Sequence, residues 1–473
     1  MTGPARRCVL TVTGTSAILG APVARAADAA AGFTGAGLST VWALPFAGLL
    51  LSLALWPIFN ADFWHRHYGK ISAAWALALI VPFAVMFGAD ETFHQLLHAL
   101  LLEYLPFVVL LFALYTVSGG IAVRGTLVGT PKLNTSLLTI GAMLASVMGT
   151  TGAAMLLIRP LLRANEGRKH LVHIVVFFIM LVGNVGGALT PLGDPPLFIG
   201  FLNGVDFFWT TRFLALPTLL LAAALLGIFY AVDTWRWRRE THSEPAVYEP
   251  LAIDGAVNFS LIAAVVAAVL LSGVWKPGIA LHLAGIGLEL QNVVRDTALT
   301  AIAVLSLVLT PRGVRGSNAF SWEPIAEVGK LFAGIFVTII PVIAMLQAGR
   351  AGALASVVEL VTDRAGEPRH VMYFWTTGLL SAFLDNAPTY LVFFNLAGGD
   401  ASALMGPLHK TLTTISAGAV YFGALTYVGN APNFMIKAIA EQRGIPMPGF
   451  FAYFAYASLV LLPLLIIVTA LYG

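Results

Sequence analysis

Charged residues are scarce in this chain of 473 residues, where they make up 10% of the sequence against 58% hydrophobic residues. The mean hydropathy is +0.86. So few charges cannot cover the surface of a soluble protein of this size, which excludes a soluble globular domain. The composition predicts an all-α polytopic membrane protein whose main partner is the lipid bilayer.

Two further scarcities exclude other classes. Cys8 is the single cysteine, which excludes an intramolecular disulfide and a thiolate metal cage. The net charge is only +3, and the Lys and Arg residues lie in short loops rather than in one basic face, so no nucleic acid partner is expected. No nucleophile and base pair occurs at membrane depth, so the chain is not expected to be an enzyme.

The N-terminus has the three parts of a secretory signal. Arg6 and Arg7 precede a moderately apolar run, 8–23, which is followed by Ala24-Arg25-Ala26. This order predicts a signal peptide over 1–26. The alternative is a first membrane helix, but the run is short for a span and contains four hydroxyl residues.

Apolar segments organise the rest of the chain. Ten are long enough to cross a membrane with some tilt: 41–59, 71–88, 100–117, 171–202, 213–235, 257–275, 297–310, 330–348, 411–436 and 450–471. Two others, 137–158 and 371–396, carry polar, helix-breaking residues at their centres, Gly149-Thr150-Thr151-Gly152 and Asp385-Asn386-Ala387-Pro388. Such breaks predict two re-entrant hairpins.

The placement of Lys and Arg supports this topology. When the mature N-terminus is outside and both hairpins return to their own side, most Lys and Arg residues fall in cytoplasmic loops, as short loops require. Counting either hairpin as a full span would move many of them outside. The pattern predicts a bacterial inner membrane protein whose mature N-terminus and C-terminus are both periplasmic.

Two of the spans are broken by a repeated motif. Nine residues, 188–196, recur as 424–432 with five identities, and they contain Gly193-Asp194-Pro195-Pro196 and Gly429-Asn430-Ala431-Pro432. Proline and a polar side chain inside an apolar run predict helices interrupted at membrane depth.

The order of spans, hairpins and broken helices repeats with opposite orientation. The predicted parts are N-terminal scaffold spans (41–99), a first repeat (100–235), linking spans (236–329) and a second, inverted repeat (330–473). Inverted repeats with discontinuous helices that meet at mid-membrane are the construction of secondary transporters.

The repeats predict two half-sites in which each hairpin tip meets the broken helix of its own repeat. Thr150-Thr151 is aligned with Asp385-Asn386, and Asp194 with Asn430. One half-site gathers Thr150, Thr151, Thr190 and Asp194, and the other gathers Asp385, Asn386, Thr426 and Asn430. Carboxylates, neutral oxygens and free carbonyls suit an alkali cation.

Asp194 and Asn430 also stand where helices restart, so their side chains are expected to act as N-caps as well as ligands. Desolvation favours a neutral carboxyl group and a bound cation favours a carboxylate, so protons and a cation would compete for Asp194 and Asp385. If only loaded forms cross, that competition is an exchange mechanism. Arg159, after the first hairpin, could snorkel to the surface or steer an anion.

The motifs at the hairpin tips and breaks resemble those of the NhaD-type sodium/proton antiporters. More broadly the chain is similar to the ion transporter superfamily, which includes arsenite permeases, citrate carriers and sodium-coupled dicarboxylate symporters. The resemblance covers the chain from about Leu44 onward. It implies a scaffold, a mobile domain that makes an elevator step, and a homodimer. The dicarboxylate branch has Ser-Asn-Thr at its tips, which this chain lacks.

The favoured hypothesis is a sodium/proton antiporter in which Asp194 and Asp385 alternate between proton and cation. Its small-ion substrates are Na⁺ and H⁺, with no cofactor and no other metal. The alternative is a sodium-coupled symporter of citrate or another organic acid anion. An ion channel is a weaker rival, because inverted broken helices do not resemble a repeated pore lining.

Overall fold

The structure is a computed structural model that describes residues 34–240, 248–318 and 320–471. The predicted signal peptide, 1–26, lies outside the described residues. Within them, eight helices are long and apolar enough to cross a membrane, or nine if the bent pair α13 (Glu323–Thr338) and α14 (Ile340–Gln347) is one span. The prediction of a helical membrane protein is therefore confirmed, with fewer continuous spans than the ten predicted.

The breaks account for much of this difference. The predicted span 411–436 is divided into α19 (His409–Phe422) and α20 (Ala431–Gln442), each too short to cross alone. The predicted span 171–202 is also interrupted, although its first part, Val172–Leu189, is one of the eight spans, and α13 and α14 meet at an angle of 44°. Hydropathy alone does not register these interruptions, because the residues that break the helices stand inside apolar runs.

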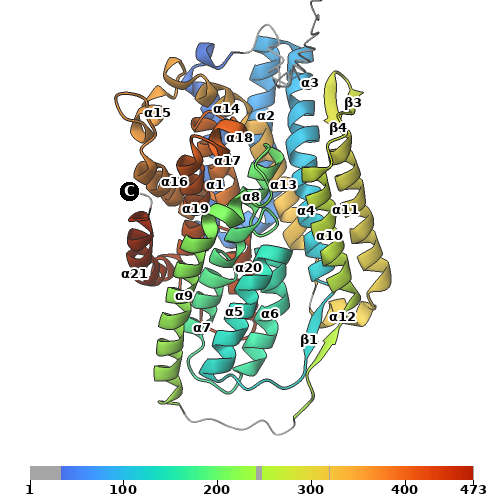
Figure 1. The fold of residues 1–473 in the computed structure, drawn as a ribbon, viewed down its shortest axis with the longest axis vertical. Helices are drawn as coiled ribbons and strands as arrows, with labels where there is room; N and C mark the ends of the chain where they lie inside the picture. The colour runs from blue at the N-terminus through green and yellow to red at the C-terminus, as the bar shows by residue number, and fades with distance from the viewer. Residues whose placement is uncertain (1–33, 241–247, 319, 472–473) are drawn as a thin grey trace, which may run out of the picture. The chain divides into compact units, whose positions relative to one another are not determined.

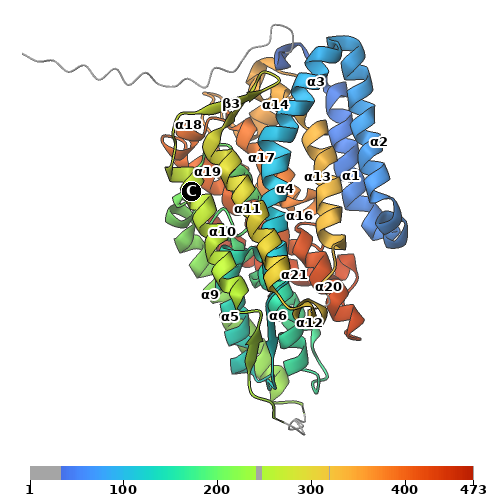
Figure 2. The same ribbon diagram turned by 90° about the vertical axis from the view of Figure 1, so that its right-hand side faces the viewer.

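The N-terminal and linking elements pack against one another beside the repeats (Figures 1 and 2). They are η1 (Gly35–Gly37), η2 (Thr40–Ala43), α1 (Leu44–Phe59), α2 (Ala61–Phe87), α3 (Ala89–His98), the π-helical turn η3 (Ala99–Tyr104), α4 (Leu105–Ser118), β1 (Ala122–Arg124), β2 (Ala252–Asp254), α10 (Val257–Val274), β3 (Ala280–Leu283), β4 (Ile286–Glu289), α11 (Leu290–Leu309) and α12 (Arg312–Ser317).

The two short sheets are antiparallel pairs. β1 pairs with β2, and β3 pairs with β4. At the edge of the first pair Arg124 donates a hydrogen bond of 2.7 Å to Asp254, and this bond holds the pKa of the exposed Asp254 carboxyl below its usual range. The pair joins the chain after α4 to the chain before α10.

After α4, which opens the predicted first repeat (100–235), that repeat consists of a helical hairpin, a broken helix and a long helix. Its elements are α5 (Pro131–Met148), α6 (Thr150–Ala164), α7 (Val172–Leu181), η4 (Val185–Leu189), α8 (Pro195–Leu202) and α9 (Trp209–Trp237). The second repeat has η5 (Gly349–Ala351), α15 (Ala355–Val361), α16 (His370–Leu384), α17 (Asn386–Leu396), α18 (Ala401–Met405), α19, η6 (Gly423–Leu425), α20 and α21 (Phe450–Thr469).

The repeats correspond element by element. The interval of 236 residues that separates Asp194 from Asn430 also relates α5 to α16, α6 to α17, α7 to α19, α8 to α20 and α9 to α21. In Figure 1 the hairpin α5–α6 lies in the lower half of the view, whereas α16 and α17 lie in the upper half. The two hairpins thus reach the middle from opposite ends.

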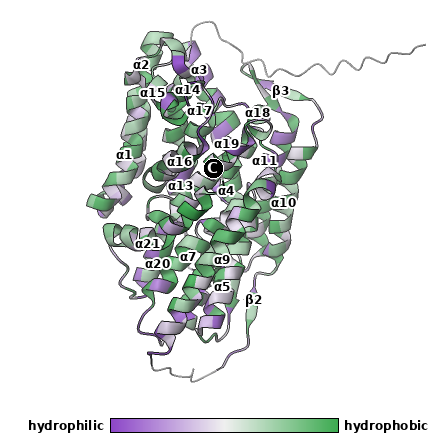
Figure 3. Cartoon of the chain, turned by 60° about the vertical axis from the view of Figure 1, so that its left-hand side comes forward, coloured by the Kyte–Doolittle hydropathy of each residue, from purple (hydrophilic) through white to green (hydrophobic). Residues whose placement is uncertain are grey.

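The distribution of apolar residues differs between the outer helices and the broken helices. In Figure 3 the ribbon of α1 is mostly green, whereas purple segments gather in the turns and at helix ends. By contrast α7 is buried along its whole length. Apolar side chains therefore serve two purposes, lipid contact on the outer helices and packing around the broken helices.

Candidate functional site

Each hairpin turns at one residue with left-handed backbone. Gly149, between α5 and α6, has φ 80° and ψ 151°, and Asp385, between α16 and α17, has φ 77° and ψ 145°. These positions are therefore structurally equivalent, and Thr150 corresponds to Asn386. This differs by one residue from the predicted alignment of Thr150-Thr151 with Asp385-Asn386. Asp385 adopts a conformation that usually favours glycine.

Paired glycines allow the chain to fold tightly at both breaks. A Cβ on Gly193 would lie 2.1 Å from the carbonyl oxygen of Gly187, and a Cβ on Gly429 would lie 2.7 Å from that of Gly423. Both contacts are with backbone, which cannot move away cheaply. Glycine recurs in the motif because the backbone packs against itself there.

The two threonines of the breaks hold the backbone. Thr190 donates its hydroxyl proton to the carbonyl oxygen of Ser146 on the first hairpin, and Thr426 donates to that of Ala382 on the second. Their hydroxyl oxygens accept hydrogen bonds from backbone N–H groups two residues further on. Thr190 and Thr426, which we predicted as ligands, thus fasten each break to its own hairpin.

Asp194 lies at the centre of the site and is 1% exposed. Its Oδ1 accepts hydrogen bonds from Asn430 Nδ2 at 2.9 Å and from Thr150 Oγ1 at 3.4 Å, and its Oδ2 accepts one from Asn386 Nδ2 at 2.7 Å. Two of the three donors belong to the other repeat. The predicted half-sites are therefore joined into one site around Asp194.

The expected N-caps at the breaks are not formed by side chains. Asp194 and Asn430 occupy the N-cap positions of α8 and α20, but neither side chain accepts a hydrogen bond from the helix. Asp385 does cap its helix, because its Oδ1 accepts from the N–H of Ala387 at 3.2 Å. Asp194 is instead free to bind the amides of the opposite repeat.

Two asparagines that we did not predict as site residues connect the breaks. Asn184 Nδ2 donates to Asn433 Oδ1 at 2.8 Å, and Asn430 Nδ2 donates to the carbonyl oxygen of Gly183 at 3.0 Å. Asn433 Nδ2 in turn donates to the carbonyl oxygens of Gly423 and Thr426. An asparagine inside the apolar run 171–202 was the only signal in the sequence for Asn184.

A cavity of about 610 Å³ borders the site. Five of the eight predicted site residues line it: Thr150, Thr151, Asp194, Asp385 and Asn430. His65, Glu323 and Gln442 also line it, and they stand beside loops that we predicted to be cytoplasmic. The further charged lining residues are Glu327 and Arg159, and Tyr115 and Tyr427 also line the cavity.

The lining is rich in carboxylates. Four carboxylates line the cavity, together with Arg159 and His65: Asp194, Asp385, Glu323 and Glu327. Within the described ranges, no ion pair includes Asp194 or Asp385. A region with several acidic groups and one permanent cation attracts positive charge.

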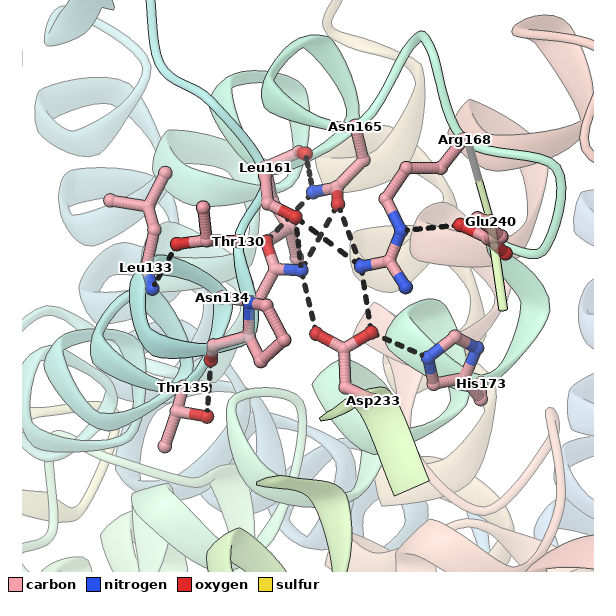
Figure 4. A network of polar contacts seen from close by, with 12 residues as sticks. Thr130, Leu133, Asn134, Thr135, Leu161, Asn165, Arg168, His173, Asp233 and Glu240 are labelled. Atoms are coloured by element: carbon pink, nitrogen blue, oxygen red, sulfur yellow. Dashed lines mark hydrogen bonds and ion pairs between the residues drawn. The ribbon is translucent and has the colours of Figure 1, made fainter. Parts of the chain in front are cut away.

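A second polar cluster lies at the base of the first hairpin (Figure 4). Arg168 Nη1 lies 2.7 Å from Asp233 Oδ1, and Arg168 Nε donates to Glu240 at 3.0 Å. His173 Nε2 lies 2.9 Å from Asp233 Oδ1. The side chains of Arg168, Asp233 and Glu240 are at most 4% exposed, and the guanidinium also lies over the Trp237 ring.

This cluster ties together four elements. Asn134 near the start of α5 donates to Asp233 near the end of α9 at 2.9 Å, and Asn165 after α6 donates to Asn134 at 2.8 Å. His173 stands at the start of α7. The cluster therefore fixes both legs of the hairpin to α7 and α9. We did not predict it, because its members are 106 residues apart at the extremes and each sits in an ordinary loop or helix end.

Inverted hairpins and broken helices around a buried acidic site define the class of secondary transporters. A family model agrees with this class: CitMHS_2, described as "Putative citrate transport", matches residues 35–472. The match covers nearly the whole chain, so the chain belongs to this family of membrane transporters, in keeping with the broader ion transporter superfamily. None of the curated proteins matches the chain.

Proposed function

We propose that the protein is a sodium/proton antiporter of the NhaD type in the bacterial inner membrane. The observation that carries the proposal is that Asp194 and Asp385, from different repeats, line one cavity and form no ion pair with a Lys or Arg of the described chain. An unpaired carboxylate at membrane depth is costly and is kept mainly where it binds a proton or an ion. Binding either Na⁺ or H⁺ removes that cost.

The neutral groups around Asp194 support a cation substrate. Asn386 is fully buried, and its Oδ1 has no hydrogen-bond partner while its Nδ2 donates to Asp194. A buried amide oxygen without a donor is unusual. A bound Na⁺ would supply the missing partner, since this ion prefers oxygen ligands.

Exchange follows from competition at the two carboxylates. When Na⁺ is bound both carboxylates stay ionised, and when Na⁺ leaves, protons neutralise them. An elevator step of the hairpins and broken helices past the scaffold, within a homodimer, would carry the site across only when it is loaded with Na⁺ or with protons. Periplasmic mature termini belong to the same proposal.

The alternative is sodium-coupled symport of citrate or another organic acid anion. The family description favours it, and so does the cavity, whose volume of about 610 Å³ exceeds what one ion needs. However, Arg159 is the one Arg or Lys among the described lining residues. A tricarboxylate bound there would face four acidic side chains, which the Coulomb energy of like charges disfavours.

Transport by the purified full chain in liposomes tests the proposal. An inward sodium gradient should drive proton release from vesicles that contain a pH-sensitive dye. Asp194→Asn and Asp385→Asn should each abolish the signal, whereas Asp206→Asn, in an exposed loop after α8, should retain it. Full exchange in both site variants would refute the assignment of these carboxylates.

Uptake of labelled citrate distinguishes the alternative, a sodium-coupled symporter, from the proposed antiporter. Sodium-dependent accumulation of citrate without sodium-driven proton release would establish the symporter instead. Ion flux far above the turnover of a transporter would indicate a channel. Transport of neither sodium nor citrate by protein that binds neither would contradict both proposals.

A further inference from the structure

Glu103 is an acidic residue at membrane depth that our sequence analysis did not single out. It lies near the middle of the 30-residue apolar helix Ala89–Ser118, between Leu102 and Tyr104. Ionisable side chains in the middle of membrane spans are rare and mark ion or proton pathways. Glu103 is therefore a functional candidate on position alone.

The local backbone is an independent observation. Residues Ala99–Tyr104 form a π-helical turn, and such turns occur frequently at functional sites. The Tyr104 hydroxyl donates to the carbonyl oxygen of Gly329 on α13 at 3.0 Å. This bond fixes the widened turn against the neighbouring helix, so the position of Glu103 is defined.

Glu103 lies on the face of the helix that leads to the cavity. Ala99, Phe107 and Leu110 stand four residues before, four after and seven after it, and all three are buried. Leu110 and Leu114 line the cavity, but Glu103 does not. Seven residues of helix place Glu103 about 10 Å from Leu110 along the axis. Glu103 thus lies on the same helix face as Leu110, about two turns before the part of the helix that lines the cavity.

One of the elements packed against η3 is α8, whose N-cap residue is Asp194. These elements are α3, α4, α13 and α8, and Figure 1 shows α8 beside α4. Their ionisable groups are Asp90, Glu91, His94 and His98 on α3, Tyr115 on α4, Glu323, Glu327 and Lys330 on α13, and Asp194 at the N-cap of α8. The Lys330 amine lies over the Tyr68 ring of α2. No hydrogen bond or ion pair to the Glu103 carboxyl occurs among the residues that the structure describes.

We propose that Glu103 is a proton-transfer residue of the scaffold, which serves the part of the pathway beyond the cavity. Its carboxylate takes a proton from water and returns it to water or to the ion site when that site opens away from the present cavity. This inference rests on the proposed exchange of sodium for protons. It adds a third carboxylate that handles protons and does not bind sodium.

Two transport modes distinguish this role from a structural one. Exchange of internal labelled sodium for external sodium needs no proton transfer, whereas exchange of sodium for protons does. In Glu103→Gln liposomes we expect sodium/proton exchange to fall at least tenfold while sodium/sodium exchange stays within twofold of the original protein. Asp90→Asn, an exposed carboxylate of the same helix, is the matched control and should change neither mode.

A second measurement needs no variant. A hydrophobic carbodiimide reacts with protonated carboxyl groups in membranes, and mass spectrometry of the labelled full chain locates the product. We expect labelling at Glu103 that decreases as pH rises and is insensitive to sodium, whereas sodium should protect Asp194 and Asp385.

The outcomes separate the two proposals. Equal loss of both modes in Glu103→Gln, unchanged sodium/proton exchange, or no pH-dependent labelling would each overturn the role of Glu103. If the original protein carries out neither mode, the proposed antiport itself is wrong, whatever the labelling at Glu103 shows.

Discussion

In the first repeat the hairpin turns at Gly149 and the break carries Asp194, whereas in the second the hairpin turns at Asp385 and the break carries Asn430. The backbone at these four positions is nearly the same in both repeats, but the carboxylate has changed places. Because the two breaks contact each other, both carboxylates still reach one cavity. The two repeats thus share the backbone of the site, and each supplies one of its two carboxylates.

The bases of the two hairpins differ more strongly. In the repeat alignment, which has an interval of 236 residues, His370 is equivalent to Asn134, Leu404 to Arg168 and Thr469 to Asp233. In the described part of the second repeat no ion pair forms at these positions, and Thr469 accepts a hydrogen bond from Trp375 at 3.1 Å. The first hairpin thus has buried ion pairs at its base, whereas Thr469, at the position equivalent to Asp233, makes a neutral hydrogen bond.

The largest expected effect on stability comes from replacing a residue of the ionic cluster at the base of the first hairpin with the residue at the equivalent position of the second repeat. Arg168→Leu leaves Asp233 and Glu240 buried without a cation, which should lower the free energy of unfolding by about 3 to 5 kcal/mol. The midpoint of thermal unfolding in detergent measures this. Arg124→Leu, which removes an exposed Arg and carboxylate pair, should change it little.

The double variant Arg168→Leu/Asp233→Thr reproduces two positions of the second repeat at once. It should recover part of the lost stability, because Asp233, one of the two buried carboxylates left without a cation, is removed as well. A single variant as stable as the original protein would show that the cluster does not hold the hairpin.

The next effect concerns the position of the charge at the breaks. Asp194→Asn should weaken sodium binding about 10- to 100-fold, because it removes the negative charge of a proposed sodium ligand, and a polar interaction with a charged group is worth about 1.5 to 3 kcal/mol. The swap Asp194→Asn/Asn430→Asp returns a carboxylate to a position 2.9 Å away and should restore part of the affinity. Isothermal titration with sodium measures both.

The sodium affinity of the swap variant should recover only in part. Asn430 Nδ2 also donates to the carbonyl oxygen of Gly183 and to Asn184, and an aspartate cannot replace those donations. Asn430→Asp alone serves as the control, since it adds a second carboxylate beside Asp194 and should disfavour the sodium-free state. No recovery in the swap would mean that the two breaks are not interchangeable.

The break between α19 and α20 and the turns at Gly149 and Asp385 were predictable from the sequence, because each leaves a local mark in an apolar run. The inverted membrane orientation of the repeats stays a prediction. Thr150, Asp194, Asp385 and Asn430 were predicted from the same marks, and the structure brings them to one cavity. Thr190 and Thr426 were expected to be ligands, but their hydroxyls satisfy backbone groups, which a residue type alone does not reveal.

Contacts between repeats could not be derived from local pattern. Asn386 meets Asp194 across 192 residues, so the merging of the half-sites depends on how the two broken helices pack. The burial of Arg168 and Asp233 is likewise a tertiary property, because similar residues near helix ends are usually exposed. Glu103 was overlooked within an otherwise apolar run, although its charge at that depth was visible in the sequence.

The smallest expected effect on stability concerns the hairpin tip. Asp385→Gly gives the second tip the residue that the first has at Gly149. A non-glycine residue at φ 77° carries strain of about 1 kcal/mol, which glycine removes. The cap on the Ala387 N–H is lost, but replacing an Asp cap by Gly costs only a few tenths of a kcal/mol. The variant should therefore be as stable as the original protein or slightly more stable.

The transport activity of Asp385→Gly should fall even though its stability does not, because the variant lacks one of the two carboxylates proposed to exchange sodium for protons. Asp385→Ala is the matched control: it loses the cap and keeps the strain, so its thermal midpoint should lie below that of Asp385→Gly. If Asp385→Gly were the less stable of the two, the aspartate would be present at this turn for folding. If Asp385→Gly is stable and inactive, Asp385 is retained in a strained conformation for its charge.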